Sequence, residues 1–231
     1  MGTFGIGKPV RRKEDNRFVL GNGIYQDDVE LGNVTYAAFV RSPYAYADII
    51  SVDKSAALNI PGVLAVLTSV DLPNHLYNGF PCLADIWIDL ECGAGQPAKY
   101  PHNPLLATKR VRHVGETVAM VISRTLSSAK LAVEAVNVIY NELAPIVDTA
   151  SATLETSPQI HSEVPHNISF VWEHGDDSRT KAVFESAAHV TSIELINNRV
   201  AVMPIEPRGA TGSFDTESKT FTLVTNAQHI Y

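Results

Sequence analysis

Cysteine is scarce in this sequence, where Cys82 and Cys92 are the two cysteines among 231 residues. No Cys-x-x-Cys pair occurs, so a disulfide-rich scaffold is excluded. The same count excludes an iron–sulfur cluster held by four cysteines of this chain. Free thiols in a reducing compartment are expected, and a zinc site that adds His75 and His102 is the less favoured alternative.

Long apolar runs and excess positive charge are also lacking. No segment approaches the roughly 20 apolar residues that a membrane-spanning helix needs. No apolar run follows Arg11, Arg12 and Lys13, as a signal peptide would require. The net charge of -7 argues against a dedicated nucleic-acid binder, which would show a basic face. We therefore expect a soluble cytoplasmic protein without a transmembrane segment and without a nucleic-acid partner.

The composition that remains is globular, with 45% hydrophobic and 19% charged residues. Apolar, β-branched runs predict strands, of which 117–122 should be central and 63–68 buried on both faces. Apolar positions every three to four residues after Thr125 predict a capped helix inside a strand–helix–strand unit. The strands predicted in this part are 36–40, 48–52, 63–68, 117–122 and 138–140, and a short helix is predicted at 55–59.

Two stretches lack periodic patterns. Prolines and glycines break residues 71–108, which we interpret as a long excursion that is functional or binds a partner. Residues 150–165 are rich in Ser, Thr, Glu and Pro and have the composition of a linker. His161 and His166 lie at its end, but their five-residue spacing faces no common direction on a helix. A metal-binding pair is therefore not expected.

The last part of the chain is predicted to end in a hairpin. Strands at 210–214 and 220–225 flank a polar turn at 215–219, and alternation places Phe221 and Leu223 on a buried face. Before the hairpin, the pattern predicts a strand at 168–172, a helix that begins near Asp176–Ser178 and runs to Ala188, and a strand at 190–196.

Polar residues follow the second arm of this hairpin: Asn226, Gln228 and His229. Spacing alone favours the interpretation that they only mark the end of a strand. However, amides and an imidazole at the end of a buried strand are also suited to contact a ligand.

Acidic residues at three other places were considered as sites. Gln26-Asp27-Asp28 has no third carboxylate at calcium-loop spacing, so we predict a solvated turn. Glu206 and Arg208 share one face of a predicted strand, which favours a salt bridge or an interdomain contact over catalysis. Glu116 follows a glycine and is expected in a turn or an interface.

Taken in order, several stretches resemble the molybdenum-binding large subunit of the xanthine dehydrogenase/aldehyde oxidase/carbon monoxide dehydrogenase family. They include Arg-Phe-Val-Leu-Gly-Asn-Gly-Ile-Tyr-Gln-Asp-Asp at 17–28 and Ile-Glu-Pro-Arg-Gly-Ala at 205–210. The others are 5–7, 38–45, 60–63, 111–119, 138–145 and 197–199. The likeness covers nearly the whole chain, and its Glu-Pro-Arg segment resembles bacterial three-subunit members.

The resemblance implies an α+β fold, an a/b hammerhead domain followed by the truncated start of a molybdopterin-binding domain. We accordingly expect an N-terminal arm at 1–19, the hammerhead domain at 20–147, a linker at 148–166, and the incomplete molybdopterin-binding domain at 167–231. In the family, a glutamine at the position of Gln228 faces an oxo ligand of the molybdenum. Gln228 is therefore the expected cofactor-binding residue, although Thr-Asn-Ala at 225–227 departs from the Thr-Ser-Thr usual there.

The family implies oxidation of an aldehyde, an N-heterocycle or carbon monoxide with oxygen from water. Its catalytic glutamate and its glycine-rich loop belong to segments beyond Tyr231, so no catalytic residue and no metal ligand are assigned here. We expect molybdopterin, in the cytosine dinucleotide form, to bind only with the remainder of the large subunit. Iron–sulfur clusters and FAD are expected on a small and a medium partner subunit.

Two functions follow from this resemblance. The favoured one is the N-terminal part of a molybdenum hydroxylase large subunit that is inactive alone and acts on a small-molecule substrate with the remainder. The alternative is a non-catalytic hammerhead module that docks or assembles the iron–sulfur and flavin subunits.

Overall fold

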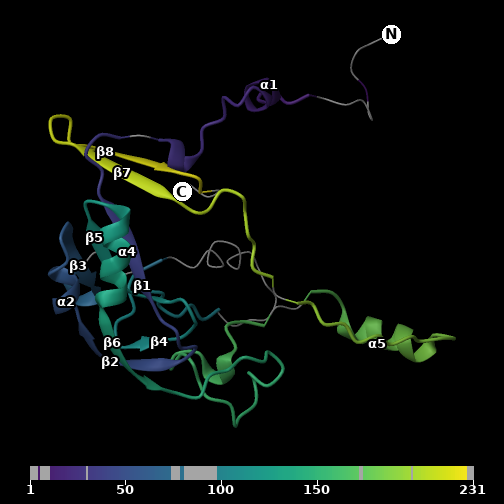
Figure 1. Cartoon of the computed structure of the whole chain (residues 1–231). Helices are drawn as coiled ribbons and strands as arrows, with labels where there is room; N and C mark the ends of the chain where they lie inside the picture. Colours follow the sequence, from purple (N-terminus) through teal and green to yellow (C-terminus); the bar gives the residue numbers. More distant parts are fainter. Residues whose placement is uncertain are drawn as a thin grey trace. The chain divides into compact units, whose positions relative to one another are not determined.

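The computed structural model describes residue 5 and residues 11–29, 31–73, 79–80, 98–171, 174–198 and 200–227. The chain forms two compact units, Val34–Val190 and the combination of Met1–Asn33 with Thr191–Tyr231. Each unit is described by itself below, and Figure 1 labels their elements. In the described part of the chain, no helix has the length and apolar character to cross a membrane.

The first sheet of the Val34–Val190 unit is antiparallel, in the order β1-β5-β3. Its strands are β1 (Tyr36–Arg41), β5 (Thr117–Ser123) and β3 (Val63–Thr68). The central place of β5 confirms the prediction from its β-branched run. The prediction that 63–68 is buried on both faces is wrong, because Val66 is the one buried residue of β3 and Leu64 is 47% exposed.

A second antiparallel sheet has the order β4-β2-β6. It contains β4 (Arg110–Val111), β2 (Ala47–Asp53) and β6 (Asn137–Glu142). The helix α4 (Leu126–Ala135) connects β5 to β6. The predicted succession of strand, helix and strand is therefore present, but its two strands belong to different sheets and do not form one βαβ unit.

Small residues let α4 approach the first sheet closely, and Figure 1 shows the helix lying along β5 and β1. Ala129 and Ala132 of the helix are fully buried, as are Ala119 and Val121 of β5. The short helix α2 (Ser55–Leu58) adds Ala57 to the same core. The hydrophobic cluster is made of Val40, Ala57, Val66, Ala119, Val121, Ala132 and Val136.

Hydrogen bonds tie the first turn of α4 to the sheet. Thr125 caps the helix as predicted, since its Oγ1 accepts from the Ser128 backbone N–H at 3.1 Å. The Ser128 Oγ lies 2.6 Å from the Ser123 Oγ, which donates to the Gly62 carbonyl at 2.7 Å. Gly62 has a φ of +92°, a left-handed conformation that favours glycine.

The segment after β6 contains η4 (Pro165–Asn167) and α5 (Asp177–Ser186). The predicted start of α5 is confirmed, because the Asp176 side chain accepts from the Arg179 N–H at 2.9 Å. No strand forms in 190–196 or in the described residues 168–171. An alternating pattern stabilises a strand only when a neighbouring backbone completes the ladder. In the described part of the chain neither segment belongs to a ladder, although the Ser169 carbonyl accepts one bond from the Lys99 N–H at 2.8 Å.

The other unit carries η1 (Gln26–Asp28) and the predicted hairpin of β7 (Ala210–Asp215) and β8 (Thr220–Thr225). The arm before residue 20 includes a short helix, α1 (Asp15–Val19). The expected burial of the second hairpin arm is wrong, since Phe221 is 81% and Leu223 is 66% exposed.

Removal of the α4 cap should weaken the Val34–Val190 unit. The substitution Thr125→Ala leaves the Ser128 N–H without its acceptor, so we expect a loss of about 1 kcal/mol in the free energy of unfolding. For a chain of this size, that loss lowers Tm by about 2–4 °C. Thermal unfolding followed by circular dichroism measures it, with Thr216→Ala in an exposed turn as the control. Equal Tm values for the two variants would contradict the capping role.

Asp71 of η2 (Ser69–Asp71) should make stability depend on acid pH. Lys54 at 2.7 Å and the Thr68 N–H lower the pKa of Asp71 to about 2. Because the folded-state pKa is depressed, this stabilisation is present above pH of about 4 and is lost as pH falls toward about 2. We expect Asp71→Asn to lower Tm at pH 6, and this difference to shrink between pH 4 and 2. An exposed Asp27→Asn variant is the control, and a Tm difference that is constant with pH would refute the assignment.

Candidate functional site

The exit of β8 is the first candidate site, because the predicted cofactor contact follows it. Gln228 and His229 lie outside the described residues, so their roles stay predictions. Asn226 is described and is engaged with the chain itself. Its Nδ2 donates to the Pro207 carbonyl at 2.7 Å, and its Oδ1 accepts from the Gly209 N–H at 3.3 Å.

The loop before β7 is bonded to this exit from both sides. The Thr225 Oγ1 donates to the Gly209 carbonyl at 2.9 Å, next to the two bonds of Asn226. Both backbone groups of Gly209 are therefore satisfied by side chains at the end of β8. These bonds fix where the chain leaves the hairpin, two residues before Gln228.

A segment near the start of the chain joins the same cluster. The Glu206 Oε1 accepts from the Gln26 backbone N–H at 2.8 Å, and the Gln26 side chain contacts Thr211. The prediction of a solvated turn is therefore wrong for Gln26, which is 8% exposed, although Asp27 and Asp28 are exposed. Of the two alternatives predicted for Glu206 and Arg208, the salt bridge does not form, since Arg208 is exposed. Glu206 instead contacts Gln26 in a distant segment of the chain. The sequence singled out Gln26 only within a turn and within the 17–28 stretch, and no pattern indicated its contact with Glu206, 180 positions away.

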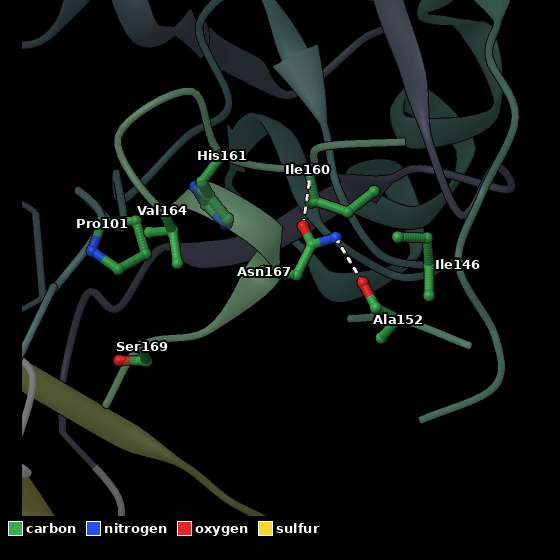
Figure 2. A pocket seen from close by; sticks show the side chains of 8 residues that line it. All are labelled: Pro101, Ile146, Ala152, Ile160, His161, Val164, Asn167 and Ser169. Carbon is green, nitrogen blue, oxygen red and sulfur yellow. Dashed lines mark hydrogen bonds between the residues drawn. The ribbon is translucent and has the colours of Figure 1, made fainter. Parts of the chain in front are cut away.

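A pocket of about 330 Å³ in the Val34–Val190 unit is the second candidate. Figure 2 shows Asn167 between Ile160 and Ala152, where its Oδ1 accepts from the Ile160 N–H and its Nδ2 donates to the Ala152 carbonyl. The walls of the pocket are mostly apolar. They consist of Pro101, Ile146, Ala152, Ile160, His161, Val164, Asn167 and Ser169. The stretch predicted as a linker thus folds around this pocket.

His161 is the polar wall residue with unused hydrogen-bonding capacity, since its Nδ1 is buried without a hydrogen bond. The Glu163 Oε1 lies 3.9 Å from the His161 Nδ1. Burial, and then the charge of Arg112, lower the pKa of His161 below its usual value, so its imidazole is neutral at pH 7. Such a ring can accept a hydrogen bond but adds no charge to the pocket.

Asp48 and Arg110 of the second sheet, together with Tyr46 just before β2, hold this stretch in place. Asp48 accepts from the Arg110 Nε at 2.6 Å, and Arg110 donates to the Tyr46 hydroxyl at 2.9 Å. The Tyr46 hydroxyl in turn lies 3.3 Å from the Gln159 carbonyl, to which it donates. The Arg110 guanidinium also holds the pKa of Asp48 below its usual range. The wall of the pocket therefore rests on a bonded network rather than on a mobile loop.

Within the described ranges, no three His, Cys, Asp or Glu side chains are grouped in a way that could hold a metal ion. The alternative of a zinc site included His75, Cys82 and Cys92, and these three residues lie outside the described ranges. Glu116, which was expected in a turn, accepts from the Arg112 N–H and closes the 112–116 turn. Its pattern therefore reflects local structure.

Comparison with known proteins identifies two domains in order along the chain. Residues 20–144 match the aldehyde oxidase and xanthine dehydrogenase a/b hammerhead domain, and residues 160–231 match the molybdopterin cofactor-binding domain. The carbon monoxide dehydrogenase large chain of Hydrogenophaga pseudoflava is 34% identical over 88% of this chain and 25% of its own length. The nicotine 6-hydroxylase large subunit of Paenarthrobacter nicotinovorans is 31% identical over 91% of this chain and 24% of its own.

Solved structures agree with the sequence matches. The reconstituted CO dehydrogenase from Oligotropha carboxidovorans superposes with a TM-score of 0.82 at 32% identity, over 96% of this chain and 27% of that one. The chain thus spans about a quarter of the relatives that it matches. The predicted fold, a hammerhead domain followed by the start of a molybdopterin-binding domain, is confirmed. With both domains matched in order along its length, the chain belongs to the aldehyde oxidase and xanthine dehydrogenase family.

Proposed function

We propose that this chain is the N-terminal part of a molybdenum hydroxylase large subunit and works with the remainder of that subunit. The observation that carries the proposal is the ordered match of residues 20–144 and 160–231 to the two domains. In this proposal the arm covers 1–19, the hammerhead domain 20–147, the linker 148–166 and the incomplete cofactor domain 167–231. The reaction is oxidation of an aldehyde, an N-heterocycle or carbon monoxide with oxygen from water.

The exit of β8 fits a molybdopterin group in its chemistry. Residues 225–227 carry no charge, and the amide of Asn226 is already held by Pro207 and Gly209. A neutral donor at Gln228 can therefore approach an oxo group without adding charge or competing for these bonds. The cofactor, in our proposal a cytosine dinucleotide, supplies the two-electron redox chemistry when bound.

Exposed apolar side chains support the need for a completing chain. Ile193 and Leu195 are each 77% exposed, and Ile205 is fully exposed. A run of such residues is unfavourable in water and marks a surface that another chain segment covers. The remainder of the large subunit is our proposed cover, and electrons leave through iron–sulfur clusters and FAD on small and medium subunits in the cytoplasm.

The chain alone should hold no molybdenum, because one predicted donor, Gln228, cannot replace the several segments that enclose such a cofactor. We expect less than about 0.1 molybdenum per chain by elemental analysis after purification, and restored metal content when the remainder of the subunit is co-expressed. Stoichiometric metal on the isolated chain would refute the requirement for the remainder. An assembled complex with the small and medium subunits but without activity would favour the docking module.

Gln228 should matter only in the assembled subunit. Replacement by Leu removes the neutral donor, and we expect the turnover rate or the metal content to fall about 10–100-fold. Gln159→Leu changes the same kind of side chain in the Val34–Val190 unit and is the matched control. Equal effects of the two substitutions would exclude Gln228 as a cofactor contact.

A further inference from the structure

We infer that Gln26 is a positioning residue, which fastens the β7–β8 hairpin and thereby sets where its exit lies. This inference rests on the proposed function, because the exit leads to Gln228. Gln26 falls in the part of the chain that matches the hammerhead domain, whereas the partners of its backbone N–H and of its side chain fall in the part that matches the cofactor domain. The described contacts place it in the compact unit that contains the hairpin.

The backbone N–H of Gln26 bonds a residue far along the chain. Gln26 begins η1, in which the Asp28 side chain accepts from the Tyr25 N–H at 2.8 Å and fixes the turn. A backbone N–H in the first turn of a helix has no acceptor within that helix. The N–H of Gln26 donates instead to the Glu206 carboxylate at 2.8 Å, and hydrogen bonds to a charged acceptor are among the stronger ones.

The side chain of Gln26 bridges the two strands of the hairpin. In the orientation that satisfies both ends of the amide, its Nε2 donates to the Val224 carbonyl at 3.0 Å. Its Oε1 accepts from the Thr211 Oγ1 at 2.6 Å and from the Thr211 N–H at 3.2 Å. Thr211 and Val224 lie opposite each other in the β7–β8 ladder, so one amide spans the pair.

Gly209 explains how the two segments come so close. A Cβ on Gly209 would lie 2.5 Å from the Gln26 Cγ, a distance that real atoms do not tolerate. Glycine therefore allows the loop to pass against the stem of the glutamine. The same Gly209 is bonded to Thr225 and Asn226, so its contact with Gln26 leads directly to the strand exit.

A solely local role does not account for this arrangement. The contacts of Gln26 reach the loop before β7, both strands, and the glycine that the exit residues bind. The hairpin has one aromatic contact of its own, Phe214 with Phe221 at 4.5 Å between ring centroids, but most side chains of β7 and β8 are exposed. Loss of the amide should therefore release the exit while leaving the Val34–Val190 unit intact.

Hydrogen exchange measured by mass spectrometry on the full 231-residue chain tests this inference. Gln26→Met keeps the size of the side chain but removes the amide, and we expect protection in peptides that cover 208–212 and 222–227 to fall at least 10-fold. Peptides from β5 should keep their protection, and Gln159→Met, which alters an exposed amide elsewhere, should change neither region. Unchanged hairpin protection, or an equal loss in β5, would overturn the inference.

Two further variants separate positioning from general stability. Gln26→Glu places a carboxylate next to Glu206 and the Val224 carbonyl, so protection relative to wild type should be poor at pH 8 and recover as the new carboxyl protonates at lower pH. In the wild-type background, Gly209→Ala should reduce hairpin protection at least 10-fold, because the new Cβ collides with the Gln26 Cγ. Added to Gln26→Ala, which lacks that Cγ, the same substitution should reduce protection less than 2-fold further. Additive effects, or no recovery at low pH, would overturn the inference.

The proposed function can fail separately. If the assembled wild-type subunit carries no molybdenum while Gln26→Met still releases the hairpin, the positioning role stands and the cofactor assignment falls. If metal is bound and Gln26→Met leaves the hairpin protected, the positioning role falls and the proposed function stands.

Discussion

A buried polar group must find hydrogen-bond partners, and this constraint organises the unit that ends the chain. The hairpin β7–β8 has mostly exposed side chains, so apolar packing contributes little to its placement. Its loop and its exit are held instead by the amides of Gln26 and Asn226, the hydroxyl of Thr225 and the carboxylate of Glu206. Each of these bonds has directional geometry, so together they hold the loop and the exit in one arrangement.

The Val34–Val190 unit is built on the opposite principle. Its centre is β5, which pairs with strands on both sides and packs small and β-branched residues against α4. Some polar groups in that core bond to one another, such as Ser123, which is linked to Ser128 and to the Gly62 carbonyl. The same chain thus contains a unit with an apolar core and a hairpin that is hydrogen-bonded to a distant segment.

Local patterns predicted the local structure well. The caps at Thr125 and Asp176, the central strand β5 and the hairpin around 215–219 are present because each depends on neighbouring residues. The strand at 190–196, the burial of Phe221 and the solvated turn at Gln26 were wrong, because each depends on a partner far along the chain. The family and the fold were identified because many short stretches resemble the family in the same order along the chain. Gln228 lies outside the described residues, and its predicted role still rests on the family resemblance alone.

The sequence separation of Gln26 and Glu206 also bears on how the chain is made. These residues are 180 positions apart, so at usual rates of synthesis Gln26 leaves the ribosome about 10–40 s before its partner exists. The contiguous Val34–Val190 stretch is translated in that interval and can fold on its own contacts. An amide waits in water without penalty, whereas an apolar anchor would invite aggregation. A glutamine therefore suits a contact that forms only after the rest of the chain has been synthesised.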